Sequence, residues 1–175
     1  LGMGKELRAI GINMDYAPVL DVHSNPINPI IGQRSLDTDP KKVARLGAEL
    51  IRGFYDAGVI PVGKHFPGHG DTSQDSHLTL PRVERTRESL EKTELIPFAH
   101  AIQQGLEVIM SAHVVYPAWD AEQPATFSPT IMNELLRKTL QFDGLLISDD
   151  LEMQAIDQKL ESIPKLGTQA GIDLF

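Results

Sequence analysis

The chain contains no cysteine, few basic residues and no long apolar run. The absence of cysteine excludes disulfides and thiolate metal sites, and it leaves the cellular compartment open. Because 16 Lys and Arg stand against 24 Asp and Glu, the net charge of −8 argues against a nucleic acid or an anionic membrane as partner. No segment reaches the length needed to cross a bilayer. We therefore expect a soluble protein that acts on a small neutral ligand.

The length of 175 residues suits one domain, which we take to span residues 1–175. The chain starts at Leu1 rather than at Met, and Leu1 to Ile10 already has the pattern of a helix. We expect the true N-terminus, and any targeting signal, to lie upstream. A cytoplasmic location is the expectation, with secretion or a periplasmic location as alternatives.

Apolar runs typical of strands alternate with segments of helical periodicity. The best helix spans Pro40–Ala57, with Asp39 as its cap and Gly58 after its end. Two further helices are predicted over Glu88–Gln104 and Pro129–Gln141, and a long loop over Asp21–Pro40. The predicted strands are Ile12–Tyr16, Val59–Gly63, Val108–Ala112, Leu145–Ser148 and Ile172–Phe175.

Alternating strands and helices predict an α/β protein with parallel strands. Lys64-His65, His113 and Asp149-Asp150 each follow a different predicted strand, as catalytic groups do in (β/α)8 TIM barrels. A glycine-rich GxGxxG turn or P-loop, common in open doubly wound sheets, is absent. A complete barrel typically needs about 250 residues. We therefore predict an incomplete barrel in which this chain supplies about the last five strands.

The segment KHFPGHGDTSQDSHLTLP, residues 64–81, holds three of the six histidines between glycines and prolines. Within it, Asp75 precedes His77 by two residues, so both side chains leave the same face of an extended segment. This spacing suits an acid/base dyad in which the carboxylate orients the imidazole, on a loop able to close over a ligand. The alternative is a solvated loop histidine beside an acid.

Other roles stay open on the residues alone. Asp149 and Asp150 each suit a nucleophile, a metal ligand or a helix cap, and Arg34 suits either ligand binding or a surface ion pair. The helical zinc motif HExxH is absent. A metal-dependent barrel hydrolase remains an alternative, with ligands drawn from His65, His69, Asp71, His77, His113 and Asp149.

Four ordered motifs cover most of the chain: NMDYAPVLDV at 13–22, NPINPIIGQRS at 25–35, the segment at 64–81 and ISDDLEM at 147–153. Together they closely resemble family 3 glycoside hydrolases, and within that family the bacterial β-N-acetylglucosaminidase type. The resemblance implies a (β/α)8 barrel that hydrolyses terminal β-linked N-acetylglucosamine with retention of configuration, in some members during peptidoglycan recycling. It implies a small carbohydrate substrate and no cofactor or metal.

The resemblance also implies roles for particular residues. Asp149 matches the nucleophile, and His77 matches the general acid/base with Asp75 as its partner. Lys64, His65 and Arg34 match positions that bind the sugar. An imidazole suits proton transfer near neutral pH because its ordinary pKa is about 6.5.

Family members carry a preceding half-barrel with further sugar-binding residues, and this sequence has no match to it. We therefore expect self-association, or pairing with the missing half-barrel, and no activity for the isolated chain. Alternatives are a related β-glucosidase, the metal-dependent hydrolase above and a non-catalytic sugar-binding protein.

Overall fold

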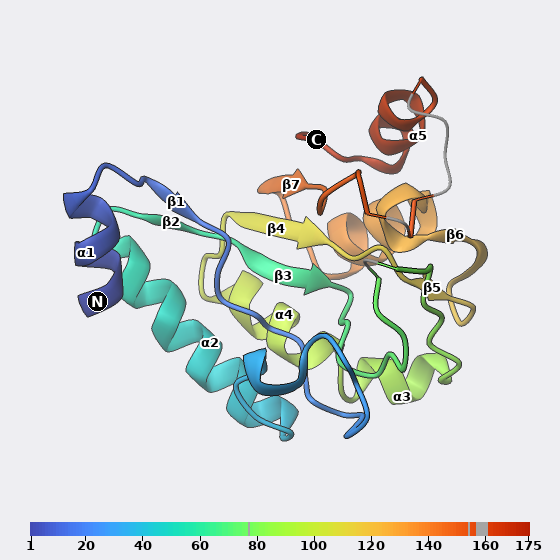
Figure 1. Cartoon of the computed structure of the whole chain (residues 1–175), viewed down its shortest axis with the longest axis horizontal. Coiled ribbons are helices and arrows are strands. Elements are labelled where there is room, and N and C mark those ends of the chain that lie inside the picture. The colour runs from blue at the N-terminus through green and yellow to red at the C-terminus, as the bar shows by residue number, and fades with distance from the viewer. Residues whose placement is uncertain (77, 154, 157–160) are drawn as a thin grey trace.

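A computed structural model describes residues 1–76, 78–153, 155–156 and 161–175, which form an α/β fold built on parallel strands (Figure 1). Strand β1 (Met14–Asp15) pairs with β2 (Ile60–Pro61). Strand β3 (Gly63–Phe66) pairs with β4 (Val108–Ser111), which pairs in turn with β7 (Leu145–Ile147). All of these pairs are parallel, so the carboxyl ends of the strands lie at one edge.

Single parallel bridges extend this array at both sides. Val19 bridges to Lys64, and Leu174 bridges to Ile147. Each of the five predicted strands therefore contains or adjoins a parallel pairing, in sequence order. One boundary was wrong: the strand expected over Val59–Gly63 is interrupted at Val62, and Lys64 and His65 lie within β3, which begins at Gly63, rather than after a strand.

The predicted helix after Asp39 is confirmed as α2 (Pro40–Tyr55), and the N-terminal helix as α1 (Gly2–Ala9). The Asp39 carboxylate accepts a hydrogen bond of 2.9 Å from the backbone N–H of Lys41, as expected for an N-cap. Helix α2 buries one apolar face, which includes Val43 and Phe54. None of the helices in the described ranges is long and apolar enough to cross a membrane.

The helix expected over Glu88–Gln104 is two helices, α3 (Arg87–Glu91) and α4 (Leu95–Gln103). Pro97 lies in the first turn of α4, where it lacks the N–H that would bond to the carbonyl of Thr93. A proline is tolerated in a first turn and not in a helix interior, which accounts for the break at residues 92–94.

The region after β4 contains elements that the sequence patterns did not predict. An antiparallel hairpin joins β5 (Val115–Tyr116) to β6 (Asp120–Pro124) and leads into the short 3₁₀ helix η2 (Ala125–Phe127). The predicted helix after Ser128 is present, but as a π-helix, η3 (Thr130–Thr139). The last helix is α5 (Ile163–Ala170).

The two faces of the parallel array have different neighbours. Ile109 and Leu146 pack into the large core with residues of α4 and η3, and α2 and α4 lie together along one side of the strands (Figure 1). The opposite face carries a separate small cluster of Val62, Val108, Met110 and Ile147. Alternation along each strand therefore separates a helix-facing set of side chains from the set on the opposite face, here called the inner face.

Candidate active site

A polar cavity of about 340 Å³ lies at the carboxyl ends of the parallel strands. Four of the predicted site residues meet there: Lys64 and His65 from β3, Asp149 just after β7, and Arg34 from the short 3₁₀ helix η1 (Gly32–Arg34). The remaining lining residues are Ile30, Ile31, His69 and Ser76. Residues distant in sequence thus share one small site.

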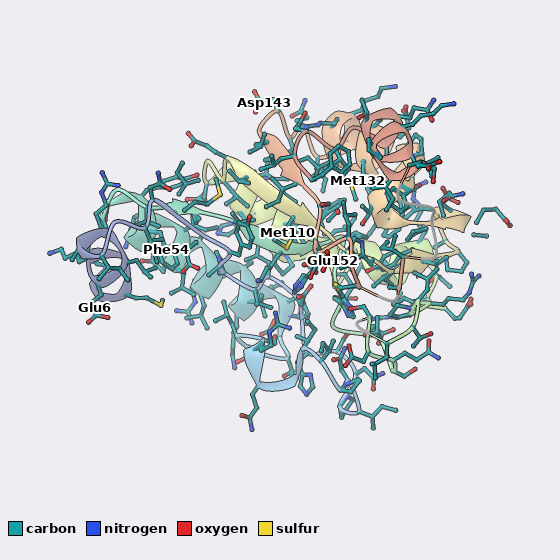
Figure 2. All side chains as sticks on the ribbon, turned by 45° about the horizontal axis from the view of Figure 1, so that its top comes forward. Glu6, Phe54, Met110, Met132, Asp143 and Glu152 are labelled. Atoms are coloured by element: carbon teal, nitrogen blue, oxygen red, sulfur yellow. The ribbon has the colours of Figure 1, made fainter. Side chains whose placement is uncertain are left out.

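The structure distinguishes the two adjacent aspartates. Asp149 is two residues beyond Ile147, and by strand alternation it continues the inner face. Asp149 lines the cavity with Lys64, whereas Asp150 does not. The Asp150 carboxylate instead accepts a bond of 2.9 Å from the backbone N–H of Glu152. Both aspartates line a second hollow of about 450 Å³ that includes Met110 and Glu152, which Figure 2 labels near the centre of the molecule.

His65 is held by Asp21, a fully buried carboxylate. The His65 ring donates from Nδ1 to Asp21 Oδ2 at 2.7 Å, and Asp21 Oδ1 accepts from the backbone N–H groups of His65 at 3.1 Å and His69 at 2.7 Å. Burial alone would raise the pKa of Asp21, but the attraction and hydrogen bonds of these two histidines outweigh it and lower the pKa. His65 Nε2 faces Asp149 Oδ2 at 3.8 Å.

His69 is a buried histidine with both ring nitrogens bonded. Its Nδ1 lies 2.9 Å from the hydroxyl of Thr72, and its Nε2 lies 3.0 Å from the hydroxyl of Ser76. Burial lowers the pKa of His69 to about 4, although Asp21 acts in the opposite direction. His69 is therefore neutral at physiological pH and connects β3 to the loop that carries Ser76.

The long loop after Asp21 is fixed against residues 69–72 by Asn28. Its side-chain amide donates to the carbonyls of His69 at 2.9 Å and Gly70 at 3.1 Å, and its oxygen accepts from the backbone of Ile31 at 2.7 Å. Gly70 is needed at this junction because a Cβ there would lie 1.6 Å from the backbone oxygen of Val22.

Two cations complete the cavity wall. Burial lowers the pKa of Lys64 below its ordinary value, and the nearby guanidinium of Arg34 lowers it further, while Asp149 and Asp21 act in the opposite direction. Arg34 donates to the carbonyl of Ile30 at 3.3 Å. The site therefore presents positive charge beside one carboxylate, an arrangement suited to ligand hydroxyl and carbonyl oxygens.

The predicted dyad is only partly placed. His77 lies outside the described residues. The carbonyl of Asp75 accepts from the backbone N–H of Leu78 at 3.0 Å and of Thr79 at 3.1 Å, which forms a turn. Ser76 lines the cavity, so this loop reaches the site at that residue.

The histidines proposed as alternative metal ligands have other partners where they are described. His113 is buried, with Nδ1 at 2.7 Å from the hydroxyl of Thr126 and Nε2 at 3.0 Å from the carbonyl of Asp150. Burial lowers its pKa. Across the described ranges, no group of three or more histidine and carboxylate side chains is arranged to hold a metal ion.

A second buried carboxylate, Glu94, lies at the break between α3 and α4. It accepts from the hydroxyl of Ser24 at 2.7 Å and from Arg85 at 3.4 Å, while its Oε2 has no hydrogen-bond partner in the described structure. Burial raises the pKa of Glu94 to about 7. The aliphatic part of Glu94 packs against Gly68, where an added Cβ would lie 2.7 Å away.

The sequence patterns missed Asp21, Asn28 and Glu94. Asp21 had a usable signal, because it follows the apolar pair Val19-Leu20 just as Asp149 follows its strand. Placing the first strand at residues 12–16 concealed it. The contacts that tie Asn28 to His69 and Glu94 to Ser24 gave no local signal, since these partners are distant in the sequence.

Parallel strands whose carboxyl ends gather cations, histidines and a carboxylate around a small polar cavity are typical of α/β enzymes that act on small polar molecules. The family model described as "Glycosyl hydrolase family 3 N terminal domain" matches residues 1–175. The chain belongs to glycosyl hydrolase family 3.

Curated relatives and solved structures agree with this assignment. "Beta-hexosaminidase" of Idiomarina loihiensis is 40% identical over 175 residues, covering 99% of this chain and 52% of that protein. The structure of a glycoside hydrolase family 3 β-N-acetylglucosaminidase from Paenibacillus sp. is 48% identical with a TM-score of 0.95, covering 98% of this chain and 33% of that one. NagZ from Neisseria gonorrhoeae, solved in complex with N-trifluoroacetyl-D-glucosamine, is 38% identical with a TM-score of 0.89, covering 98% of this chain and 49% of that one.

The chain spans about half or less of the length of these relatives. The alignment confirms the α/β fold of the family.

Proposed function

We propose that the protein carrying this chain is a retaining β-N-acetylhexosaminidase that removes terminal β-linked N-acetylglucosamine, with peptidoglycan or chitin-type fragments as substrates. One observation carries the proposal: Arg34, Lys64, His65 and Asp149 line a single cavity at the carboxyl ends of the strands. The names of the relatives support the choice of sugar. The proposed roles are those that the sequence motifs imply.

In the first step, a carboxylate oxygen of Asp149 attacks the anomeric carbon and forms a glycosyl ester. The bond from that carbon to the leaving oxygen breaks, and His77 gives its proton to the leaving oxygen. Asp75 orients the imidazole and stabilises its charged form. Arg34, Lys64 and His65 hold the sugar, and a cavity of about 340 Å³ has room for a single sugar ring.

In the second step, water attacks the anomeric carbon and the bond to Asp149 breaks. His77, now neutral, takes the proton of the water, so that both residues return to their starting forms. Two displacements at the same carbon give net retention of configuration.

We further propose that the parallel array is part of a (β/α)8 barrel. Apolar side chains are well exposed at both ends of the array: Tyr16, just after β1, at 51%, and Leu174, in the bridge to Ile147, at 46%. Exposed apolar strand edges favour further pairing. The occupant we propose is the other half-barrel of the same protein, with a second copy of the chain as the alternative outcome.

The test is to trap the glycosyl ester in the whole protein. A 2-fluoro or 5-fluoro donor of the N-acetylglucosamine series slows the second step, and peptide mass spectrometry then locates the label. Label on Asp149 supports the proposal. Label on Asp150, or on no aspartate while substrate is turned over, rejects the assigned nucleophile and mechanism. Absence of any N-acetylglucosaminide hydrolysis rejects the proposed activity.

A further inference from the structure

The buried aspartate Asp21 has a role that the sequence motifs do not assign. It is fully buried and does not line the cavity itself. It is bonded to His65, which does line the cavity. Its two oxygens accept three hydrogen bonds, all from His65 and His69. A carboxylate that has been removed from water is retained only where such partners compensate for its burial.

The two ring nitrogens of His65 face two different carboxylates. Nδ1 lies 2.7 Å from Asp21 Oδ2, and Nε2 lies 3.8 Å from Asp149 Oδ2, which is an ion-pair distance rather than a hydrogen bond. An ionised carboxylate only accepts, so Asp21 fixes a proton on Nδ1. A neutral ring would then present the lone pair of Nε2 to the negative charge of Asp149. A ring with protons on both nitrogens is attracted by both carboxylates.

His69 provides an internal contrast. Both of its ring nitrogens face hydroxyl groups, those of Thr72 and Ser76. A hydroxyl can donate or accept, so a neutral ring is fully satisfied there. The two rings meet edge to face with centroids 5.8 Å apart, and burial keeps His69 uncharged. The other charged groups around the cavity are Lys64 and Arg34.

We propose that Asp21 is a positioning residue that holds His65 as an imidazolium, with its second N–H directed at Asp149 and the ligand cavity. This inference rests on the proposed function for its consequence in catalysis. The imidazolium neutralises Asp21 and offers a charge-assisted donor beside the attacking carboxylate and the sugar. Asp21 also fixes the backbone of His65 and His69, so it sets the position of the cavity wall.

The first experiment determines the protonation of His65 in the whole protein, without substrate, from nitrogen–proton correlation spectra of ¹⁵N-histidine-labelled protein at neutral pH. We expect two protonated ring nitrogens on His65 and one on His69, with the signals assigned by His65→Gln and His69→Gln. A wild-type His65 ring with a single proton overturns the proposal. Because this measurement needs neither turnover nor an Asp21 variant, it decides the proposal even where the proposed activity is absent or the variant does not fold.

The second experiment compares Asp21→Asn with Asp120→Asn. Asp120 is a matched control, since its carboxylate also accepts three hydrogen bonds but lies in the β5–β6 hairpin away from the cavity. We expect Asp21→Asn to lose the second ring proton of His65 and to lower kcat/KM roughly 10-fold to 100-fold, as loss of an orienting partner typically does. Asp120→Asn should keep the second ring proton of His65 and the wild-type kcat/KM. A folded Asp21→Asn protein with a doubly protonated His65 ring, or with full activity on a substrate that the wild type hydrolyses, overturns the role of Asp21.

Discussion

The two halves of the segment from Lys64 to Pro81 are held in different ways. In the first half, Lys64 pairs with Val19 across the sheet, and the buried Asp21 binds both His65 and His69. In the second half, the Ser76 hydroxyl lies 3.0 Å from His69 Nε2, the Ser76 carbonyl accepts from the backbone N–H of Ala155, and the Asp75 carbonyl accepts from Leu78 and Thr79. The comparison teaches that Lys64 and His65, which are proposed to bind the sugar, are fixed by the sheet and by a buried carboxylate, whereas Asp75 lies in a turn outside the strands.

The largest effect is expected at the end of β7. Asp149→Asn removes the proposed nucleophile and should lower kcat by roughly 10⁴-fold or more, because the covalent route is lost. Asp150→Asn is the matched control, since that carboxylate accepts from the turn at Glu152 and does not line the cavity of Lys64 and Arg34. Steady-state kinetics on a 4-nitrophenyl N-acetyl-β-glucosaminide measure both. Equal losses of kcat for the two variants would contradict the assignment of Asp149 as nucleophile and of Asp150 as the residue that holds the turn.

The next effect separates the loop from the strand end. His77→Ala removes the proposed general acid and should lower kcat by roughly 10²-fold to 10⁴-fold on a substrate with a poor leaving group. The loss should shrink on a 4-nitrophenyl substrate, whose leaving oxygen needs little protonation. Lys64→Ala should weaken turnover of both substrates to a similar extent, because a sugar contact does not depend on the leaving group. A leaving-group dependence at Lys64 instead of His77 would reverse the two roles.

The sequence predicted the regular elements well where their signals are local. The α2 helix has a cap, a first-turn proline and an apolar face, and each is visible in consecutive residues. The β5–β6 hairpin was missed because Asp120–Pro124 is polar, and it is held by bonds from Glu122, Gln123 and Ser128 to the carboxylate of Asp120. Strand edges and turns of this kind depend on partners that no local pattern reveals.

The same distinction applies to the site. Lys64 and Asp149 were found because polar residues after apolar runs indicate strand ends in an α/β protein. Which of Asp149 and Asp150 faces the cavity could not be read from the residues, since it depends on which face of β7 the helices cover. Asp21 and Glu94 act through burial and through partners more than 40 positions away, which only the folded chain brings together.

A third prediction concerns Gly70, which joins the two halves. A methyl group there would lie 1.6 Å from the Val22 carbonyl oxygen, a backbone atom that cannot turn aside. Gly70→Ala should therefore lower the free energy of unfolding by about 3 kcal/mol or more. Gly2→Ala is the control, because nothing lies within 4 Å of its Cβ position. Urea unfolding of the whole protein measures both, and an unchanged midpoint for Gly70→Ala would contradict the close approach of the two loops.

The smallest net effect comes from two buried groups whose pH dependences oppose each other. The pKa of His69 is about 4 when folded against an ordinary 6.5, so the unfolded chain takes up a proton first and stability falls as pH drops from 6.5 to 4. The pKa of Glu94 is about 7 when folded against 4.5, so stability falls as pH rises from 4.5 to 7. Each shift corresponds to about 3 kcal/mol, and in the wild type the two nearly cancel.

Single variants should uncover each dependence. His69→Gln leaves Glu94 alone, so its stability relative to wild type should decline as pH rises through this range, whereas Glu94→Gln should show the opposite slope. Urea unfolding at several pH values gives both differences, and subtracting the wild-type curve removes the contribution of the surface carboxylates. If both difference curves were flat, neither group would be buried as described. Opposite slopes would establish that His69, and Glu94 at the break between α3 and α4, are both uncharged near pH 6.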